Sequence, residues 1–247
     1  MNIADQKNVI ETARQKIAKA TNCVSFSGAG LSAESGIATF RDKNEGGLWS
    51  QYDPTKLASQ QGFQSDPKLV TDWYNWRRKT LAGAKANDAH HALGSQTDWV
   101  HITQNVDGLL EEGGAPPENV LHLHGSLLSD HCNARCGYTE IIDIQEPAEL
   151  RHCPDCGAYL RPAVVWFGES LPEAIFEAAI QATQQADLFL VVGTSAQVAP
   201  ASGLIDLAQE NGAEVIVVNT EPSSIVLHDG IELIGKAGSI LPKLFHS

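Results

Sequence analysis

The sequence predicts an α/β fold in which a doubly wound parallel sheet is interrupted by two insertions. Three observations lead to this fold class. Short apolar runs alternate with helical patterns along most of the 247 residues, and this order is typical of a parallel sheet covered on both faces. Polar residues follow several of these runs. Four of the five cysteines gather in one stretch that does not follow the alternation.

Composition and charge limit the classes of protein that the chain can belong to. Its 43% of hydrophobic residues can fill the core of one large domain, or of a large and a small one. A net charge of −13 with no basic block argues against nucleic acid as a partner. The apolar runs are too short to span a bilayer, and no export signal is visible. We therefore expect a cytoplasmic, monomeric protein with reduced cysteines and no membrane partner.

The first half of the chain predicts one amphipathic helix and three short strands. Val9, Ala13 and Ile17 belong to a set of apolar residues at helical spacing, which predicts a helix over residues 1–20. The predicted strands cover residues 22–26, 99–104 and 120–124.

The second half predicts helices and strands in strict alternation. A capping box from Ser170 to Glu173, with Pro172 near the first turn, predicts a helix that runs to about Ala186. Another helix over residues 201–210 should end at Asn211-Gly212. The predicted strands here cover residues 188–192 and 214–219.

Two stretches break the alternation and predict a second, smaller domain. Residues 43–81 are rich in Trp, Gln and Asp and predict a helical insertion, and residues 127–161 hold the four clustered cysteines. We therefore expect a large domain from residues 1–42, 82–126 and 162–247. The small domain would consist of residues 43–81 and 127–161.

A glycine-rich segment follows the first predicted strand. Gly28, Gly30 and Ala33 fit the dinucleotide-binding pattern G-x-G-x-x-G/A. The two glycines can adopt backbone angles closed to other residues and leave room for a phosphate, toward which the following N–H groups would point. A tight turn without a ligand remains the alternative for so short a motif. Polar residues at five predicted strand ends favour a ligand, because ligands bind at that edge of a parallel sheet.

The cysteine cluster predicts a structural zinc site. Cys132 and Cys136 form one close pair, and Cys153 and Cys156 form another sixteen residues later. Four thiolates can close a tetrahedral zinc site, and such a site leaves no open position for catalysis. The first pair has three intervening residues where two are usual. His131 and His152 are weaker candidate ligands beside the cysteines, and the fifth cysteine, Cys23, is expected in the core.

Seven segments, in one order along the chain, together resemble the sirtuins, which are NAD-dependent protein-lysine deacylases. These segments are GAGLSAESGIATFR (28–41), TQNVDGLL (103–110), LHLHGS (121–126), the four cysteines, VVWFGE (164–169), GTS (193–195) and VNTE (218–221). The resemblance implies a Rossmann-like large domain and a small domain with one structural zinc ion. It also implies that NAD lies between the two domains and is consumed as a co-substrate.

The resemblance also implies roles for individual residues at the cofactor site. The glycine loop would cradle the pyrophosphate, Phe40 would shield the reactive sugar carbon, and Asn105 with Asp107 would hold the ribose and the nicotinamide amide. The residues expected to bind NAD are Gly28, Ala29, Gly30, Ser32, Glu34, Thr39, Phe40, Arg41, Trp49, Gln104, Asn105, Val106, Asp107, Gly193, Thr194, Ser195, Asn219, Thr220, Glu221 and Ala237.

His124 is the expected catalytic residue. An imidazole is well suited to take a hydroxyl proton near neutral pH. In the family's mechanism the acyl oxygen attacks the ribose carbon as nicotinamide leaves, and the histidine then activates a ribose hydroxyl. The products are free lysine and O-acyl-ADP-ribose. His122 shares the strand face and is the rival candidate, but only His124 lies in the family's His-Gly pair.

Tyr74 and Arg77 indicate which acyl group is removed. Their spacing places both side chains on one face of a helix, where a phenol and a guanidinium can bind a carboxylate. The pair resembles the signature of the sirtuin class that removes succinyl and malonyl groups, known as class III. A solvated helix face is the simpler interpretation of the spacing alone. Val165, Phe167 and Gly168 are expected to bind the backbone of an acylated-lysine peptide or protein as an added strand.

Three other functions fit part of the sequence pattern. A protein deacetylase with little preference for acidic acyl groups would share most of these motifs, but the Tyr74–Arg77 pair and the ending of VVWFGE (164–169) resemble the acidic-acyl class. A binding module could sense NAD without releasing nicotinamide. A hydride-transferring dehydrogenase is disfavoured, because no strand ends in an acidic residue about twenty positions after the glycine loop.

Overall fold

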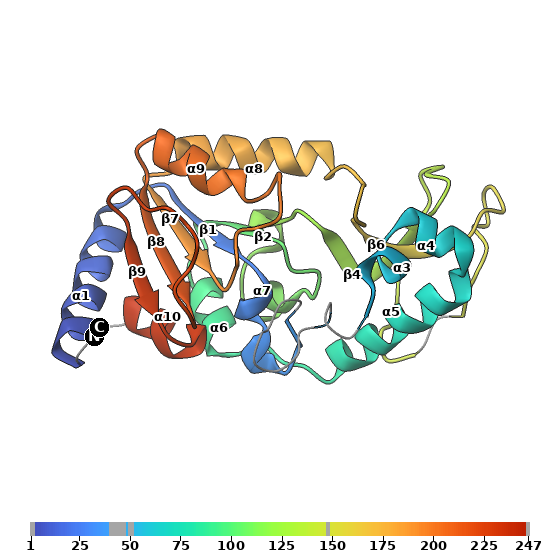
Figure 1. Ribbon diagram of the computed structural model, residues 1–247, viewed down its shortest axis with the longest axis horizontal. Helices are drawn as coiled ribbons and strands as arrows, with labels where there is room; N and C mark the ends of the chain where they lie inside the picture. The colour runs from blue at the N-terminus through green and yellow to red at the C-terminus, as the bar shows by residue number, and fades with distance from the viewer. Residues whose placement is uncertain (1–2, 40–47, 49–51, 147–148, 246–247) are drawn as a thin grey trace.

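A six-stranded parallel sheet forms the larger part of the molecule (Figure 1). The computed structural model describes residues 3–39, 48, 52–146 and 149–245. The strand order is β3-β2-β1-β7-β8-β9. The strands are β1 (Cys23–Ser27), β2 (Val100–Thr103), β3 (Val120–His122), β7 (Leu188–Val192), β8 (Glu214–Asn219) and β9 (Ile231–Ile234). The predicted α/β class with a doubly wound parallel sheet is confirmed, and β7 and β8 begin and end at the predicted residues.

Helices cover both faces of this sheet because its central strands are apolar on both sides. In β7, Leu188 and Leu190 face one core cluster, whereas Phe189 and Val191 face the other. Every side chain of β7 is buried, which explains its continuous apolar sequence. The first cluster includes residues of α1 (Ile3–Lys19), α6 (Asp88–Gly94) and α10 (Ala237–Phe245). The second includes residues of α8 (Glu173–Gln185) and α9 (Gly203–Glu210).

The start of α8 differs from the prediction. Pro172 occupies the N-cap position, and no side chain caps the helix there, so the expected capping box at Ser170 does not form. Proline has no side-chain acceptor, and placing it at the cap moves Ser170 too far from the first turn to bond its N–H groups. The helix still begins at Glu173 and ends at Gln185, one residue before the predicted end.

A three-stranded antiparallel sheet forms the other end of the molecule (Figure 1). Its order is β5-β4-β6, with β4 (Gly125–Cys132) between β5 (Thr139–Ile141) and β6 (Leu160–Val164). Three helices lie beside it, namely α3 (Pro54–Leu57), α4 (Gln60–Ser65) and α5 (Pro67–Ala82). Helical structure is therefore confirmed for the described part of residues 43–81. No helix among the described residues is long and apolar enough to cross a membrane.

A shared core and a buried ion pair fix α5 against the small sheet. Phe63, Tyr74 and Trp166 belong to one apolar cluster, which also contains Val106 from the segment after β2. Arg78 of α5 donates to Asp130 of β4 at 2.6 Å, and both side chains are buried. The same guanidinium donates to the carbonyl of Leu127 at 2.9 Å. Because the buried charge is paired and hydrogen-bonded, α5 keeps one position relative to the sheet.

Candidate active site

Polar side chains meet where four neighbouring parallel strands end. Gln104, after β2, donates to Thr194 Oγ1 at 3.0 Å. Asn219, at the end of β8, donates to the carbonyl of Thr194 at 3.1 Å. Ser27 Oγ, at the end of β1, donates to Thr103 Oγ1 at 2.9 Å. The structure therefore brings together the strand ends that the sequence analysis assigned to a dinucleotide.

Close packing against the chain after β7, rather than a positive φ, requires the two glycines of the loop. Neither adopts a positive φ, and Gly28 has ordinary extended angles of −132° and −171°. A Cβ added at Gly30 would lie 2.7 Å from the Cα of Gly193, and one at Gly28 would lie 2.8 Å from the Cβ of Thr194. The loop thus packs backbone against backbone on the end of β7. Gly193 is also restricted to glycine, because its φ is +60° and an added Cβ would lie 2.5 Å from the carbonyl carbon of Gly30.

Ser32 lies at the centre of a buried hydrogen-bond network. Its hydroxyl donates to Asp107 Oδ2 at 2.7 Å and accepts from Asn105 Nδ2 at 3.1 Å. His90 Nε2 lies 3.3 Å from the same hydroxyl. Because Asn87 N–H donates to His90 Nδ1 at 3.1 Å, the ring proton of neutral His90 lies on Nε2 and points toward Ser32. The network aligns the three predicted cofactor residues.

His90 was not found by sequence reasoning. Burial lowers the pKa of its imidazole to about 4, against the opposing influence of Asp107, so the ring is neutral near pH 7. The signal that was available is the capping box Asn87-x-x-His90 at the start of α6, in which each side chain bonds the other's backbone N–H. Only the fold reveals that this helix start lies against Ser32.

Several predicted cofactor residues lie at the rim of the same region. Glu34 accepts the Gly238 N–H at 2.8 Å and thereby joins the glycine-rich segment to the start of α10 beside Ala237. Ser195, Thr220 and Glu221 are exposed just after β7 and β8. Three predicted residues, Phe40, Arg41 and Trp49, lie outside the described residues, and Thr39 is the last described residue before them. Ala29 begins a single 3-10 turn that ends at Leu31.

His124 lies directly beyond β3, with a geometry that suits a general base. Its Nδ1 lies 3.2 Å from the carbonyl of Gln104. A carbonyl only accepts, so Nδ1 carries the ring proton and Nε2 keeps its lone pair. Burial lowers the pKa of His124, although the bond to Gln104 opposes this effect, and the ring is neutral near pH 7. The His124 carbonyl also accepts the Val165 N–H at 2.9 Å, which joins it to the predicted peptide-binding segment.

Tyr74 and Arg77 lie on one face of α5, as predicted. The guanidinium carbon of Arg77 is 5.7 Å from the Tyr74 ring centre and 5.2 Å from that of Trp73. Burial lowers the pKa of Arg77, whereas Tyr74 and Asp107 favour its charged form. Tyr74 is buried, and its oxygen accepts the Trp166 indole N–H at 2.8 Å.

The predicted peptide-binding segment is partly paired within the chain. Phe167 N–H donates to the Ala58 carbonyl at 2.9 Å, and its side chain is 49% exposed. Gly168 has φ +86°, which ends the extended run. Glu169 accepts the Trp166 N–H at 2.9 Å and holds Arg161 at 2.5 Å. A substrate strand would therefore have to use main-chain groups other than the Phe167 N–H.

Four cysteine sulfurs are arranged to hold a single metal ion. The Sγ atoms of Cys132, Cys136, Cys153 and Cys156 all lie within 4.8 Å of one another. Two of the S–S separations are 3.3 and 3.6 Å. Tetrahedral zinc with thiolate ligands places its sulfurs about 3.8 Å apart. The donor set therefore fits the predicted zinc ion, despite the wider first pair. Cys23 lies in β1, away from this cluster, as expected.

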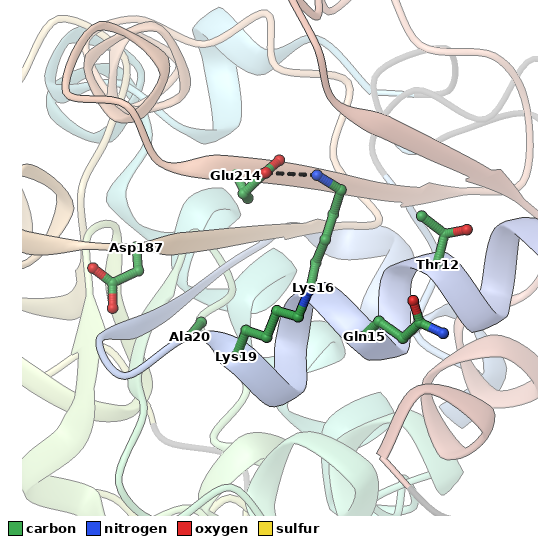
Figure 2. Close-up of a pocket in the computed structure, with 7 residues that line it drawn as sticks. All are labelled: Thr12, Gln15, Lys16, Lys19, Ala20, Asp187 and Glu214. Atoms are coloured by element: carbon green, nitrogen blue, oxygen red, sulfur yellow. Dashed lines mark ion pairs between the residues drawn. The ribbon is translucent and has the colours of Figure 1, made fainter.

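A separate surface pocket of about 370 Å³ contains none of the predicted site residues (Figure 2). It lies between α1, the residue before β7 and the first residue of β8, so it is at the beginnings of the strands, whereas the candidate active site is at their carboxyl ends. Lys16 and Glu214 form an ion pair of 2.6 Å across it. Because Lys16 and Glu214 already pair with each other, these two charged groups are not available to bind a ligand.

Comparisons with known proteins agree with this geometry. The Sir2 family model matches residues 28–200. The chain is 46% identical to NAD-dependent protein deacylase 1 of Pseudomonas aeruginosa over 92% of this chain and 94% of that protein. It is similar to a Sir2 homologue mutant in complex with ADP-ribose, with a TM-score of 0.88 and 38% identity over 95% and 94% of the two chains.

A further similarity is to Sir2Af2 bound to a myristoylated histone peptide. The TM-score is 0.74 and the identity 31%, over 97% of this chain and 95% of that one. The family model, the high identity to a full-length relative and the matching folds lead to one conclusion. The chain belongs to the Sir2 family.

Proposed function

We propose that this protein removes acyl groups from lysine side chains with consumption of NAD, and that it prefers acyl groups that end in a carboxylate, such as succinyl and malonyl. The broader class, an NAD-dependent protein deacylase, follows from the family and from the relatives of that name. The finer preference rests on one observation. Arg77 lies beside Tyr74 on α5, with its guanidinium carbon 5.7 Å from the Tyr74 ring centre.

In the proposed mechanism the residues of the strand ends orient the substrates. NAD supplies an electrophilic ribose carbon once nicotinamide leaves. Asn105 presents an amide, and Asp107 a carboxylate, to the groups around that carbon. Ser32 fixes both side chains through its 2.7 and 3.1 Å hydrogen bonds. His124 accepts a hydroxyl proton at Nε2, because its Nδ1 proton is committed to the Gln104 carbonyl.

Tyr74 and Arg77 would together bind the carboxylate of the acyl group. Because the Tyr74 oxygen accepts from Trp166, its own O–H is left as a donor. Burial raises the pKa of Tyr74, so this proton is retained in the working range of pH. Burial lowers the pKa of Arg77 although Tyr74 and Asp107 favour its charged form, so a further negative charge beside it would be stabilising. An incoming succinyl carboxylate supplies that charge, whereas an acetyl group does not.

The peptide would be recognised mainly through its backbone. Val165 and Phe167 lie in the extended segment that follows β6, next to His124, and Gly168 ends this segment. A peptide strand added there would bring an acylated lysine toward the site between α5 and the strand ends. Recognition of this kind depends little on the peptide sequence, so the acyl group carries much of the selectivity.

The decisive experiment compares succinyl, malonyl and acetyl peptides of one sequence at saturating NAD. We expect the acidic acyl groups to give the higher kcat/KM. Arg77→Met should lower desuccinylation roughly tenfold to a hundredfold, because a charge-assisted hydrogen bond contributes about 1.5–3 kcal/mol. Deacetylation should stay nearly unchanged.

Lys79→Met, on the exposed face of the same helix, is the matched control and should alter neither activity. If Arg77→Met lowered both activities equally, the carboxylate site would be wrong while the deacylase class remained. The chain would then act as a general deacetylase. Nicotinamide release without any loss of acyl groups would instead argue against the deacylase class.

A further inference from the structure

Two histidines of the β3 end bind consecutive backbone carbonyls of the cofactor site. His124 Nδ1 lies 3.2 Å from the carbonyl of Gln104, and His122 Nδ1 lies 3.1 Å from the carbonyl of Asn105. Only His124 is accounted for by the proposed chemistry. His122 has a second polar neighbour that His124 lacks among the hydrogen bonds of the described residues: its Nε2 lies 2.7 Å from Glu111 Oε1.

The two neighbours of His122 decide its charge. The Asn105 carbonyl and the Glu111 carboxylate are both acceptors, so each ring nitrogen must carry a proton for both contacts to be attractive. His122 is therefore an imidazolium paired with a carboxylate. The pKa values agree in direction: burial opposes the charge of both groups, but their mutual bond raises the pKa of His122 and lowers that of Glu111.

The charged groups around the pair come from several elements. Glu111 belongs to α7 (Leu109–Glu112), and Asp107, at the turn before α7, favours the His122 charge more weakly. His101 of β2 interacts with Glu111, but burial lowers the pKa of His101 to about 4, so it is neutral near pH 7. His124 is neutral on the same strand end. Glu111 is thus the main group that keeps His122 charged.

The carbonyl that His122 holds belongs to a residue of the cofactor site. Asn105 N–H donates to Thr103 Oγ1 at 3.0 Å, and its side chain donates to Ser32 at 3.1 Å. With His122 bound to its carbonyl, Asn105 is fixed at three points. The bond between His122 and Glu111 also holds α7, which begins two residues after Asp107. Asp107 is joined to this helix, because its Oδ1 accepts the Leu109 N–H at 3.1 Å.

We propose that His122, as an imidazolium paired with Glu111, is a positioning residue that holds Asn105 and the Asp107 turn for the nicotinamide end of NAD. When His122 loses one proton, only one of its two contacts stays attractive. A neutral ring with its proton on Nδ1 presents a lone pair to the carboxylate, and the other tautomer presents one to the Asn105 carbonyl. The proposal rests on the assignment of Asn105 to the NAD site.

The sign of the pH effect follows from the pair. The pKa of His122 is raised above the ordinary histidine value of 6.5, so the clamp is intact below that raised pKa and is lost as pH rises through it. We therefore expect kcat/KM for NAD to fall at alkaline pH. Removing the charge of Glu111 removes the main cause of the raised pKa. In Glu111→Gln the fall should move to lower pH.

Steady-state kinetics with NAD, an acylated peptide and ADP-ribose as inhibitor test the proposal. His122→Leu removes both donors and should raise the KM for NAD roughly threefold to tenfold, the loss expected for one hydrogen bond. The kcat, the peptide KM and the inhibition constant of ADP-ribose, which lacks nicotinamide, should stay within about twofold. His122→Gln keeps one N–H donor, so it should restore part of the NAD affinity while the alkaline fall disappears.

Glu112→Gln, on the next residue of α7, is the matched control and should behave as the unaltered protein. Equal losses in kcat and in every affinity would show a merely structural role and overturn the proposal, as would an alkaline fall unchanged in Glu111→Gln. Asn105→Ala tests the assignment of Asn105 to the NAD site separately from the positioning role of His122. If that variant kept full NAD affinity, Asn105 would not belong to the NAD site, whereas a loss there with none in His122→Leu would overturn only the role of His122.

Discussion

His124, the proposed base, keeps its lone pair on Nε2 because its Nδ1 donates a hydrogen bond. The Gln104 carbonyl fixes the tautomer, and burial lowers the pKa below the ordinary value of 6.5. A base must be neutral to accept a proton. On the acid side, activity should therefore stay constant until pH decreases to the lowered pKa of His124, and should fall below it. Together with the alkaline fall expected from His122, this gives a bell-shaped pH profile of kcat/KM for NAD.

His124→Ala should reduce turnover at least about a hundredfold, because it removes the proton acceptor. The bound zinc should stay at one ion per chain, since the cysteine cluster lies beside the small sheet, and the unfolding temperature should fall only by the loss of the hydrogen bond to Gln104. Kinetics, metal analysis and thermal unfolding of the same preparation measure these three properties. A variant that kept full activity would contradict the assignment of His124.

The sequence singles out individual candidate residues, but it does not reveal the contacts that set their charge and orientation. His124, the four cysteines and the Tyr74–Arg77 pair could be singled out because each has a motif or a spacing of its own, and the roles of His124 and of the pair stay predictions. The charge of His122 could not be inferred, because its partner Glu111 lies on another element, eleven residues earlier. His90 was missed for a similar reason, since its contact with Ser32 joins residues 58 positions apart.

The contact between the glycine loop and the end of β7 is the tightest element-level constraint on the cofactor site. Gly30→Ala would place a Cβ within 2.7 Å of Gly193 Cα and 2.8 Å of its carbonyl oxygen. Backbone must move to relieve such a contact, so we expect a loss of about 1–3 kcal/mol in the free energy of unfolding. The KM for NAD should rise as well, because the same loop lines the proposed site.

Gly203→Ala is the matched control for this substitution. Gly203 begins α9, and an added Cβ there would meet nothing within 4 Å. Alanine in a helix is favoured over glycine by up to about 1 kcal/mol, so this variant should be unchanged or slightly more stable. Denaturant unfolding of both variants makes the comparison, and equal stability of the two would argue against close backbone packing at Gly30.

Element prediction succeeded where burial and pattern agreed. β7 and β8 are continuous apolar runs with buried central residues, and their bounds were predicted to the residue. β9 was missed because Ile231–Ile234 is a short edge strand with a glutamate inside it, which gives no continuous apolar run. The capping box of α8 failed because local sequence does not reveal where Pro172 places the chain.

At the scale of the whole molecule, the cysteine cluster stabilises only one of the two sheets. Cys132 ends β4, the central strand of the small sheet, and Cys153 and Cys156 precede β6. β6 leads directly into the predicted peptide-binding segment. None of the four cysteines lies in the six-stranded sheet. Metal loss should therefore act first on the peptide side of the protein.

Removing zinc with a chelator should lower the unfolding temperature and raise the peptide KM more than the KM for NAD, because structural zinc contributes folding free energy. Metal analysis, thermal unfolding and kinetics after readdition of zinc measure the effect. Cys153→Ala should behave as the metal-free protein. Cys23→Ala, which alters a buried cysteine outside the cluster, should keep one zinc ion per chain. An unchanged peptide KM in the metal-free protein would contradict this division.

The second sheet and the helices beside it lie in two connections of the large sheet, so they can mutate separately from its strands. β4, β5 and β6 lie within the single connection between β3 and β7, and α3, α4 and α5 lie within that between β1 and β2. Under the proposed roles of Tyr74, Arg77 and the segment after β6, mutations in these two connections would change which acyl group or peptide is accepted, while the strands of the proposed NAD site stay the same. On this proposal, a gene of the family would acquire a new substrate through a few codons of α5 without losing its use of the nucleotide.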